Sequence, residues 1–136
     1  MKWSFNKEEL ERKLEEKLHM PKIHILKLIS DLNYLGDTTY FDKINYIILF
    51  GSCSKGIATL QSDIDLCVIT SEVLDKYEIV DLRMTLNDDT RFHVETNVVV
   101  IEEKTYIENY YEQRLYREIG GGIQIYHKGG VQHENI

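Results

Sequence analysis

Residues 44–70 read Ile44-Asn45-Tyr46-Ile47-Ile48-Leu49-Phe50-Gly51-Ser52-Cys53-Ser54-Lys55-Gly56-Ile57-Ala58-Thr59-Leu60-Gln61-Ser62-Asp63-Ile64-Asp65-Leu66-Cys67-Val68-Ile69-Thr70. Residues 44–50 are mostly β-branched or aromatic and stop at Gly51-Ser52, which predicts a buried strand that ends in a tight turn. Residues 63–70 predict a second strand. Because the side chains of a strand alternate between its two faces, Asp63 and Asp65 are expected to face the same way, about 6–7 Å apart.

Helical patterns surround these two strands. Leucines spaced four apart predict a helix from Asn6 to Lys17, which ends before Pro21. An apolar face predicts a second helix, which ends at a turn over residues 33–37. Ser71 is expected to cap a helix that runs to Leu86, followed by a loop over residues 87–90. The apolar contributors to the second helix are Ile25, Leu28, Ile29 and Leu32.

The rest of the chain predicts a third strand, a long helix and a short strand. Residues 91–101 alternate polar and apolar and then become uniformly branched. Residues 102–119 predict a helix that ends at the glycines 120–122, with one apolar row along it. Residues 123–127 predict an edge strand, and the tail from Lys128 is expected to fray. The helical row consists of Ile107, Tyr111, Leu115 and Ile119.

These elements predict one α/β (α+β) domain over residues 1–136, with a small mixed sheet flanked by helices. Within it, residues 1–35 form N-terminal helices, residues 44–101 the catalytic core, and residues 102–127 the C-terminal helix and edge strand. The chain has 136 residues, 43% hydrophobic and 29% charged, which is the balance of a globular protein.

Charge and composition exclude several classes of protein. The formal charge of −7 offers no overall attraction for nucleic-acid phosphates or an anionic membrane, so neither partner is expected. The sequence shows no apolar run long enough to span a membrane and no signal peptide, so a cytoplasmic protein is expected. Cys53 and Cys67 have neither a second pair nor clustered histidines, which predicts two reduced thiols.

Two features of residues 44–70 carry chemistry. Two carboxylates on one side of a strand can converge on a hard cation such as Mg²⁺. Burying two like charges without compensation would cost several kcal/mol, which favours a metal ion or a solvated cleft. The backbone N–H groups and hydroxyl of Gly51-Ser52 can hold a triphosphate. Phosphate and metal sites are therefore predicted to adjoin.

The phrases Leu49-Phe50-Gly51-Ser52-Cys53-Ser54-Lys55-Gly56 and Ser62-Asp63-Ile64-Asp65-Leu66-Cys67-Val68 closely resemble the signature of the minimal nucleotidyltransferases of the DNA polymerase beta-like superfamily. The resemblance runs from about Ile44 to Ile101. It implies that the Gly-Ser turn holds the β- and γ-phosphates of a nucleoside triphosphate. It also implies two Mg²⁺ ions on three carboxylates, which promote in-line transfer of the nucleoside monophosphate and release pyrophosphate.

The resemblance assigns residues to these roles. Asp63 and Asp65 are the expected metal ligands and catalytic carboxylates. The nucleotide-binding set is Gly51, Ser52, Lys55, Gly56 and Ser62. Lys55 follows Ser54 where many relatives have a small-Arg pair, and a lysine can still serve phosphate as a point charge.

The third carboxylate departs from the family pattern. Relatives commonly place an aspartate directly before a run such as Val-Val-Val, and Asn97 occupies that register here. Glu95 lies two residues earlier on the same strand face and reaches about one methylene further. We therefore predict that Glu95 is the third catalytic and metal-binding carboxylate. The alternative, an empty third position, predicts a slow or inactive enzyme.

The acceptor is left open. The resemblance implies transfer of a nucleoside monophosphate, AMP from ATP being the first expectation, to a hydroxyl group. Acceptors in the family include small aminoglycoside-type alcohols and protein side chains, and minimal members often modify a small helical HEPN toxin. A homo-oligomer is also compatible with the sequence. The alternative from another class is a nucleotidyltransferase-fold interaction protein, antitoxin-like, that has lost turnover, and Asn97 motivates it.

Overall fold

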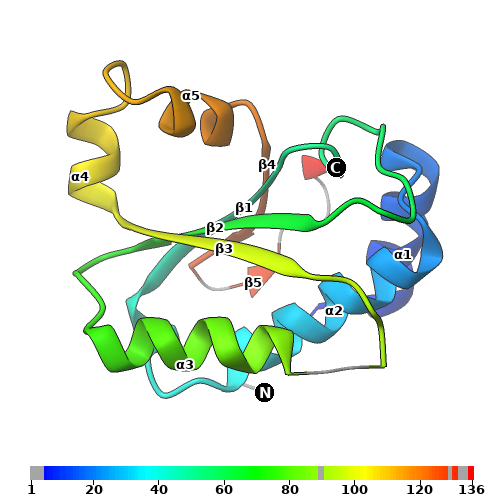
Figure 1. The fold of residues 1–136 in the computed structure, drawn as a ribbon, viewed down its shortest axis with the longest axis horizontal. Coiled ribbons are helices and arrows are strands. Elements are labelled where there is room, and N and C mark those ends of the chain that lie inside the picture. Colours follow the sequence, from blue (N-terminus) through cyan, green and yellow to red (C-terminus); the bar gives the residue numbers. More distant parts are fainter. Residues whose placement is uncertain (1–4, 89–90, 129, 132–134) are drawn as a thin grey trace.

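The computed structural model describes residues 5–88, 91–128, 130–131 and 135–136. Its centre is a five-stranded sheet in the order β3-β2-β1-β4-β5 (Figure 1). Strands β2 and β3 run parallel, and the other neighbouring pairs run antiparallel. The sheet is therefore mixed, and the predicted fold class is confirmed. The strands are β1 (Ile44–Phe50), β2 (Ile64–Thr70), β3 (Thr96–Glu102), β4 (Ile123–His127) and β5 (Gly130–Val131).

Helices cover both faces of this sheet. Helices α1 (Lys7–Leu18), α2 (Lys22–Asp37) and α3 (Lys76–Asn87) lie on one face, and α4 (Glu103–Glu108) and α5 (Arg114–Gly120) lie on the other (Figure 1). Along β2, Ile64, Leu66 and Val68 pack in the larger core with α1–α3, whereas Cys67 and Ile69 pack in the smaller core with α5. Alternation along the strand therefore places Asp65 on the face that carries α4 and α5.

The two N-terminal helices follow their leucine and isoleucine patterns, but the second is longer than predicted. In α1, Asn6 is the N-cap and accepts the N–H of Glu9 at 3.0 Å. The predicted turn over residues 33–37 is wrong, because α2 continues to Asp37. Leu35 is buried in the core, and this packing outweighs the turn propensity of Gly36. A short 3₁₀ turn, η1 (Phe41–Lys43), then leads into β1.

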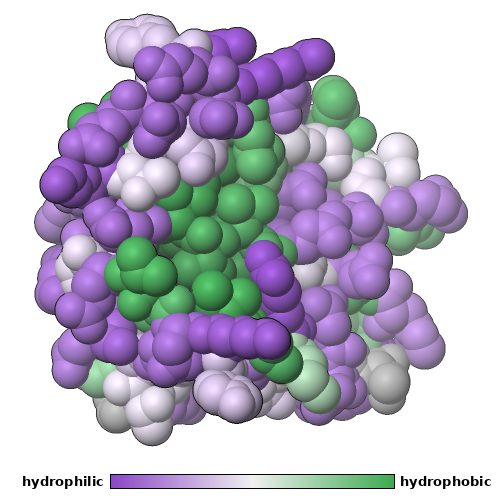
Figure 2. Space-filling view, turned by 60° about the vertical axis from the view of Figure 1, so that its left-hand side comes forward, coloured by the Kyte–Doolittle hydropathy of each residue, from purple (hydrophilic) through white to green (hydrophobic). Residues whose placement is uncertain are grey.

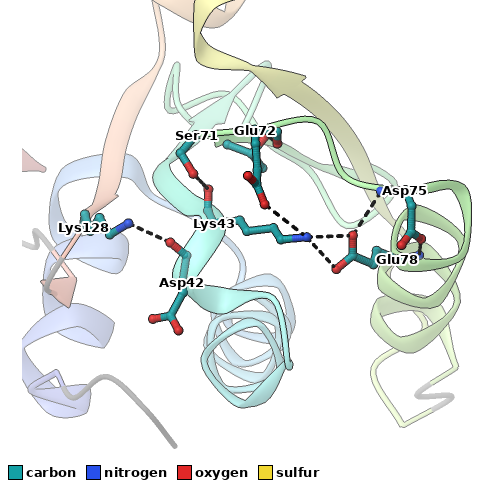
Figure 3. A network of polar contacts seen from close by, with 8 residues as sticks. Asp42, Lys43, Ser71, Glu72, Asp75, Glu78 and Lys128 are labelled. Carbon is teal, nitrogen blue, oxygen red and sulfur yellow. Dashed lines mark hydrogen bonds and ion pairs between the residues drawn. The ribbon is translucent and has the colours of Figure 1, made fainter.

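Helix α3 begins later than predicted. Its N-cap is Asp75, whose carboxylate accepts the N–H of Glu78 while the Glu78 carboxylate accepts the N–H of Asp75. Such a reciprocal capping box outcompetes the single hydroxyl of Ser71. The Ser71 backbone N–H instead donates to the carbonyl oxygen of Lys43 at 2.7 Å. The Lys43 ammonium joins Glu72 and Glu78 at 3.4 and 3.3 Å, and this network lies where β2 ends (Figure 3).

The third strand is shorter than predicted. β3 begins at Thr96, which pairs with Ile64 at the start of β2. Residues 91–95 are not part of a strand, and His93 adopts a positive φ of 52°, so the predicted strand over 91–101 is wrong in its first half. Of the predicted loop over 87–90, Asn87 ends α3, and residues 89–90 lie outside the described part of the chain.

The predicted long helix over residues 102–119 is two short helices. α4 ends at Glu108, and the side chain of Asn109 donates to the carbonyl oxygen of Thr105 at 2.9 Å. An asparagine that bonds its own backbone competes with helix continuation. In the predicted apolar row, Ile119 is buried but Tyr111 is 85% exposed. The break between α4 and α5 changes the direction of the helix axis, so residues spaced for one continuous helix do not all face the core.

The C-terminal strand β4 has the predicted bounds but is not an edge strand. It pairs with β1 on one side and with β5 on the other. The backbone N–H of Lys128 donates to Asn45, and Gly130–Val131 form β5, so the expected fraying from Lys128 is wrong for these residues. Residues 129 and 132–134 lie outside the described residues.

One side of the molecule carries an apolar patch enclosed by polar side chains (Figure 2). Strand β3 forms the sheet edge on that side, between α3 and α4 (Figure 1). The exposed apolar side chains of these two helices include Val80, Met84 and Ile107. Patches of this kind mark interaction surfaces in many soluble proteins. Within the described ranges, no helix has the length and apolar character needed to cross a membrane.

Candidate active site

The two aspartates meet at the start of β2. Asp65 pairs with Phe50 of β1 on one side and with Asn97 of β3 on the other. The Asn97 side-chain N–H₂ donates to Oδ2 of Asp63 at 3.2 Å and to Oδ1 of Asp65 at 3.2 Å. A single amide nitrogen therefore touches both carboxylates. The prediction that the side chains of Asp63 and Asp65 face the same way is confirmed.

Gly51 brings the turn after β1 against the second carboxylate. Its φ is +73°, a conformation that side-chain-bearing residues rarely adopt. A Cβ atom at this position would lie 2.3 Å from Oδ2 of Asp65. The absence of a side chain thus lets the backbone approach the acid. The predicted phosphate turn and the predicted metal ligands adjoin.

The loop after Gly51 is closed by its own hydrogen bonds. The Ser52 carbonyl oxygen accepts the N–H groups of Lys55 and Ile57, each at 3.2 Å. The Ser54 hydroxyl donates to the carbonyl oxygen of Gly51 at 2.8 Å. Gly56 ends the turn with a φ of +73°. Lys55 is exposed beside these groups, where its ammonium is accessible to an anion.

The other serine of the predicted nucleotide-binding set lies directly before the first aspartate. The Ser62 hydroxyl accepts the backbone N–H of Thr59 at 2.8 Å. In this arrangement Ser62 closes the turn that leads into β2. Its assignment to nucleotide binding remains a prediction, as do those of Gly51, Ser52, Lys55 and Gly56.

Electrostatics at the site disfavour negative charge. Burial raises the pKa of Asp65, the Asn97 hydrogen bond opposes this rise, and the charge of Asp63 adds to it. Burial, with smaller contributions from Asp65 and Asp63, also raises the pKa of Cys53 to about 11. Cys53 is fully buried, so it is a neutral thiol that fills space. A cation at the carboxylates would relieve the repulsion between them.

Glu95, the predicted third carboxylate, does not gather with Asp63 and Asp65. Within residues 5–88, 91–128, 130–131 and 135–136, no three His, Cys, Asp or Glu side chains gather as a metal site. Glu95 is exposed and precedes β3, and its carbonyl oxygen accepts the N–H of Ile64 at 2.9 Å. Its backbone thus lies at the start of β2, but its carboxylate stays apart. Asn97, which stands where relatives carry the third carboxylate, instead contacts both acids.

The donor set nevertheless suits a magnesium ion. Mg²⁺ is commonly held by one or two carboxylates together with waters and substrate phosphates. Asp63 and Asp65 supply two such carboxylates at one point, with the Gly51 turn beside them. The described side chains therefore fit one Mg²⁺ shared with a nucleotide. A second ion needs a further ligand.

No curated protein matches the chain. A crystal structure of a protein classed as a nucleotidyltransferase, from Sulfolobus solfataricus, has 18% identity and a TM-score of 0.45, covering 94% of this chain and 96% of that one. A toxin-antitoxin structure with AMP-PNP has 23% identity and a TM-score of 0.46, and covers 81% of this chain and 76% of its own. A variant of the toxin-antitoxin MntA-HpeT has 21% identity and a TM-score of 0.48, with the same coverage.

The family comparison covers more than half of the sequence. The family described as "Polymerase beta, Nucleotidyltransferase" matches residues 34–128. That range holds the Gly51 turn, both aspartates and Asn97, so it includes every side chain placed at the site above. The chain belongs to the polymerase beta nucleotidyltransferase family.

Proposed function

We propose that this protein is a Mg²⁺-dependent nucleotidyltransferase that transfers a nucleoside monophosphate, AMP from ATP in the first instance, to a hydroxyl acceptor. The observation that supports it most is the meeting of Asp63 and Asp65 at one amide nitrogen, directly beside the Gly51 turn. Nucleotidyltransferases as a family generally use a nucleoside triphosphate and a divalent metal ion, and the position of the two carboxylates beside the Gly51 turn supports the proposal that this chain binds both.

In the proposed reaction, the acceptor oxygen forms a bond to the α-phosphorus as the bond between that phosphorus and the pyrophosphate oxygen breaks. Asp63 and Asp65 would hold Mg²⁺, which neutralises charge on the phosphates when bound. The backbone of residues 51–56 and the Lys55 ammonium would hold the β- and γ-phosphates. These groups orient the α-phosphorus toward the acceptor.

Deprotonation of the acceptor hydroxyl needs a group that takes up a proton. The amide of Asn97 takes up no proton at neutral pH. Glu95 remains the proposed third carboxylate, because its backbone already lies beside the start of β2 and its side chain is exposed. In this proposal its carboxylate turns toward the acceptor when the nucleotide is bound.

A second candidate function follows from Asn97. A chain with an amide in the third position can bind nucleotide with Mg²⁺ and still fail to activate an acceptor. In that case the protein acts as an antitoxin-like binding module whose partner, a small helical HEPN protein in the family pattern, is neutralised by association. The two candidates differ in one measurable property, which is transfer of the nucleoside monophosphate.

Two measurements in sequence test these functions. Calorimetry with Mg²⁺-ATP should show binding, and Asp65→Asn should abolish it. Asp42→Asn serves as the matched control and should bind as the wild type does, because Asp42 (labelled in Figure 3) precedes the first residue of β1, whereas the site lies at the other end of that strand. Incubation with α-labelled ATP, co-purified protein and aminoglycosides then identifies the acceptor by label transfer. Binding without any transfer favours the binding module, and no binding refutes both.

A further inference from the structure

Helix α2 carries a buried polar stripe, made of His24, Lys27 and Asp31. The three side chains are 0%, 1% and 1% exposed. Their spacing of three and four residues places them on one side of the helix. The other buried polar residues among those described are Thr70 and Thr96, and Thr96 is itself a partner of the stripe. Polar groups are thus concentrated at one place in an otherwise apolar core.

The first member holds the residue before Asp63. Nε2 of His24 lies 2.7 Å from the carbonyl oxygen of Ser62. A carbonyl oxygen only accepts, so Nε2 carries the proton and donates it. The other ring nitrogen, Nδ1, is buried and has no hydrogen-bond partner in the described structure. Leaving that atom unsatisfied costs free energy, which the hydrogen bond to Ser62 has to offset.

The other two members hold the residue before Asn97. The Lys27 ammonium donates to Asp31 at 2.5 Å, to the Thr96 hydroxyl at 2.7 Å and to the carbonyl oxygen of Leu86 at 2.7 Å. The Thr96 hydroxyl donates to the second oxygen of Asp31 at 2.6 Å. All three ammonium protons have acceptors. The start of β3 is therefore fixed to α2 by a closed set of hydrogen bonds.

Each anchored residue immediately precedes a residue of the site. Ser62 precedes Asp63, and Thr96 precedes Asn97. The Ile64 N–H then donates to the carbonyl oxygen of Glu95, which joins the first residue of β2 to the residue before β3. One helix face thus sets where β2 and β3 begin relative to each other. That relation determines whether the two carboxylates and the amide meet.

A buried ion pair is a poor way to stabilise a core. Replacing such a pair by apolar residues of similar volume is often neutral or stabilising, because desolvation of the two charges offsets their attraction. An apolar stripe would bury the same helix face but would let the strands shift along it. Directional hydrogen bonds fix a position, as outer-shell partners do around metal ligands.

We propose that His24, Lys27, Asp31 and Thr96 are positioning residues that align Asp63 and Asp65 with Asn97 and thereby set the affinity of the site for a divalent cation. This inference rests on the proposed Mg²⁺ site. None of the four residues touches the cation or the nucleotide. They act through the backbone of the two site-bearing strands.

Mn²⁺ binding, measured by electron paramagnetic resonance on the intact chain, tests this inference without any requirement for turnover. His24→Leu and Thr96→Val remove the anchoring groups at nearly constant volume. Their conservative partners, His24→Gln and Thr96→Ser, keep a donor or hydroxyl in place. Lys43→Met is the matched control, because it removes a lysine that joins two carboxylates at the opposite end of β2 (Figure 3), away from the proposed site.

His24→Leu and Thr96→Val should each weaken Mn²⁺ binding about tenfold or more, with His24→Gln and Thr96→Ser restoring it. Lys43→Met should bind as the wild type does even where it lowers the melting temperature. A loss that tracks melting temperature across all five variants assigns the stripe to stability and overturns the inference. Wild-type binding with no loss in either anchoring variant also overturns it while leaving the proposed function intact. A wild-type chain that binds neither Mn²⁺ nor Mg²⁺-ATP overturns both.

Discussion

Asn97 donates a hydrogen bond to Asp65 across two parallel strands, with 3.2 Å between Nδ2 and Oδ1. The same nitrogen lies 3.2 Å from Asp63. An amide in this place offers N–H groups to two carboxylates, which is the role a cation would take. It lowers the cost of holding two like charges together but adds no charge of its own. Under the proposed function, a site with Asn97 in this place would bind a metal ion without itself activating an acceptor.

Asn97→Asp should convert the pair into three carboxylates at one point. We expect Mn²⁺ affinity to rise at least about tenfold, because a third oxygen ligand with a negative charge joins the site. The metal-free protein should lose stability, since two hydrogen bonds are replaced by like-charge repulsion. Titration of Mn²⁺ by electron paramagnetic resonance and urea unfolding without metal measure the two effects.

Glu95→Gln is the comparison variant for this prediction. If Glu95 is the working third carboxylate, its substitution lowers label transfer by about a hundredfold or more in the wild-type background. If Asn97→Asp raises transfer and Glu95→Gln leaves it unchanged, Glu95 is not the third carboxylate. Unaltered Mn²⁺ affinity in Asn97→Asp would argue against a cation site between the strands.

Gly51→Ala and Gly56→Ala form a matched pair, because both glycines have a φ of +73°. A side chain in this conformation costs about 1–2 kcal/mol, and both variants should lose about that free energy of unfolding. A Cβ at Gly56 meets the Leu18 carbonyl oxygen at an ordinary 3.6 Å, whereas one at Gly51 meets Asp65 at 2.3 Å. Displacement of the Asp65 carboxylate should therefore weaken Mn²⁺ binding about tenfold in Gly51→Ala alone. Equal binding in the two variants would contradict the close approach of turn and acid.

Both cysteines should resist alkylation in the folded protein. Burial raises the pKa of Cys53 to about 11, to which the charges of Asp65 and Asp63 contribute, and burial alone raises that of Cys67 to about 12. Only thiolates react, so at about pH 8 the reactive fraction is about a thousandth or less. Mass spectrometry after iodoacetamide should show no label in buffer and two labels in urea. Rapid labelling of Cys53 in buffer would mean that the loop over residues 51–56 opens.

Local patterns predicted the elements whose causes are local. Strand β1 has its predicted bounds because Ile44 to Phe50 combine β-branched and aromatic residues with a glycine stop. The meeting of Asp63 and Asp65 followed from the two-residue period of a strand. These features depend on neighbours in sequence, which a single sequence displays.

Features that depend on distant contacts were missed. The turn expected at residues 33–37 is helical because Leu35 packs in the core. The start of β3 is set by where β2 begins, and no pattern in residues 91–95 shows this. The α2 stripe left a visible signal, since His24, Lys27 and Asp31 interrupt an apolar helix at helical spacing. The role of these residues could not be inferred without their hydrogen-bond partners, Ser62 and Thr96, which lie far along the chain.

The pH dependence of stability should report the charge of Asp65. Burial raises the pKa of this carboxyl, the Asn97 hydrogen bond partly opposes the rise, and Asp63 adds to it. The folded protein therefore holds this proton more tightly than the unfolded chain does. The free energy of unfolding falls as pH rises from the ordinary value of about 3.9 through the raised value, and stays lower above it. Asp65→Asn removes this dependence while the remaining titratable groups stay in place.

The stability difference between Asp65→Asn and the wild type should therefore grow with pH over this window and level off above it, favouring the variant. Urea unfolding of both proteins between about pH 3 and about pH 7 measures this difference. Saturating Mg²⁺ should then stabilise the wild type and leave Asp65→Asn unchanged, because a bound cation compensates the charge that burial penalises. A difference that is constant with pH, or equal stabilisation of both proteins by Mg²⁺, would show that the charge of Asp65 does not lower the free energy of unfolding of the metal-free protein.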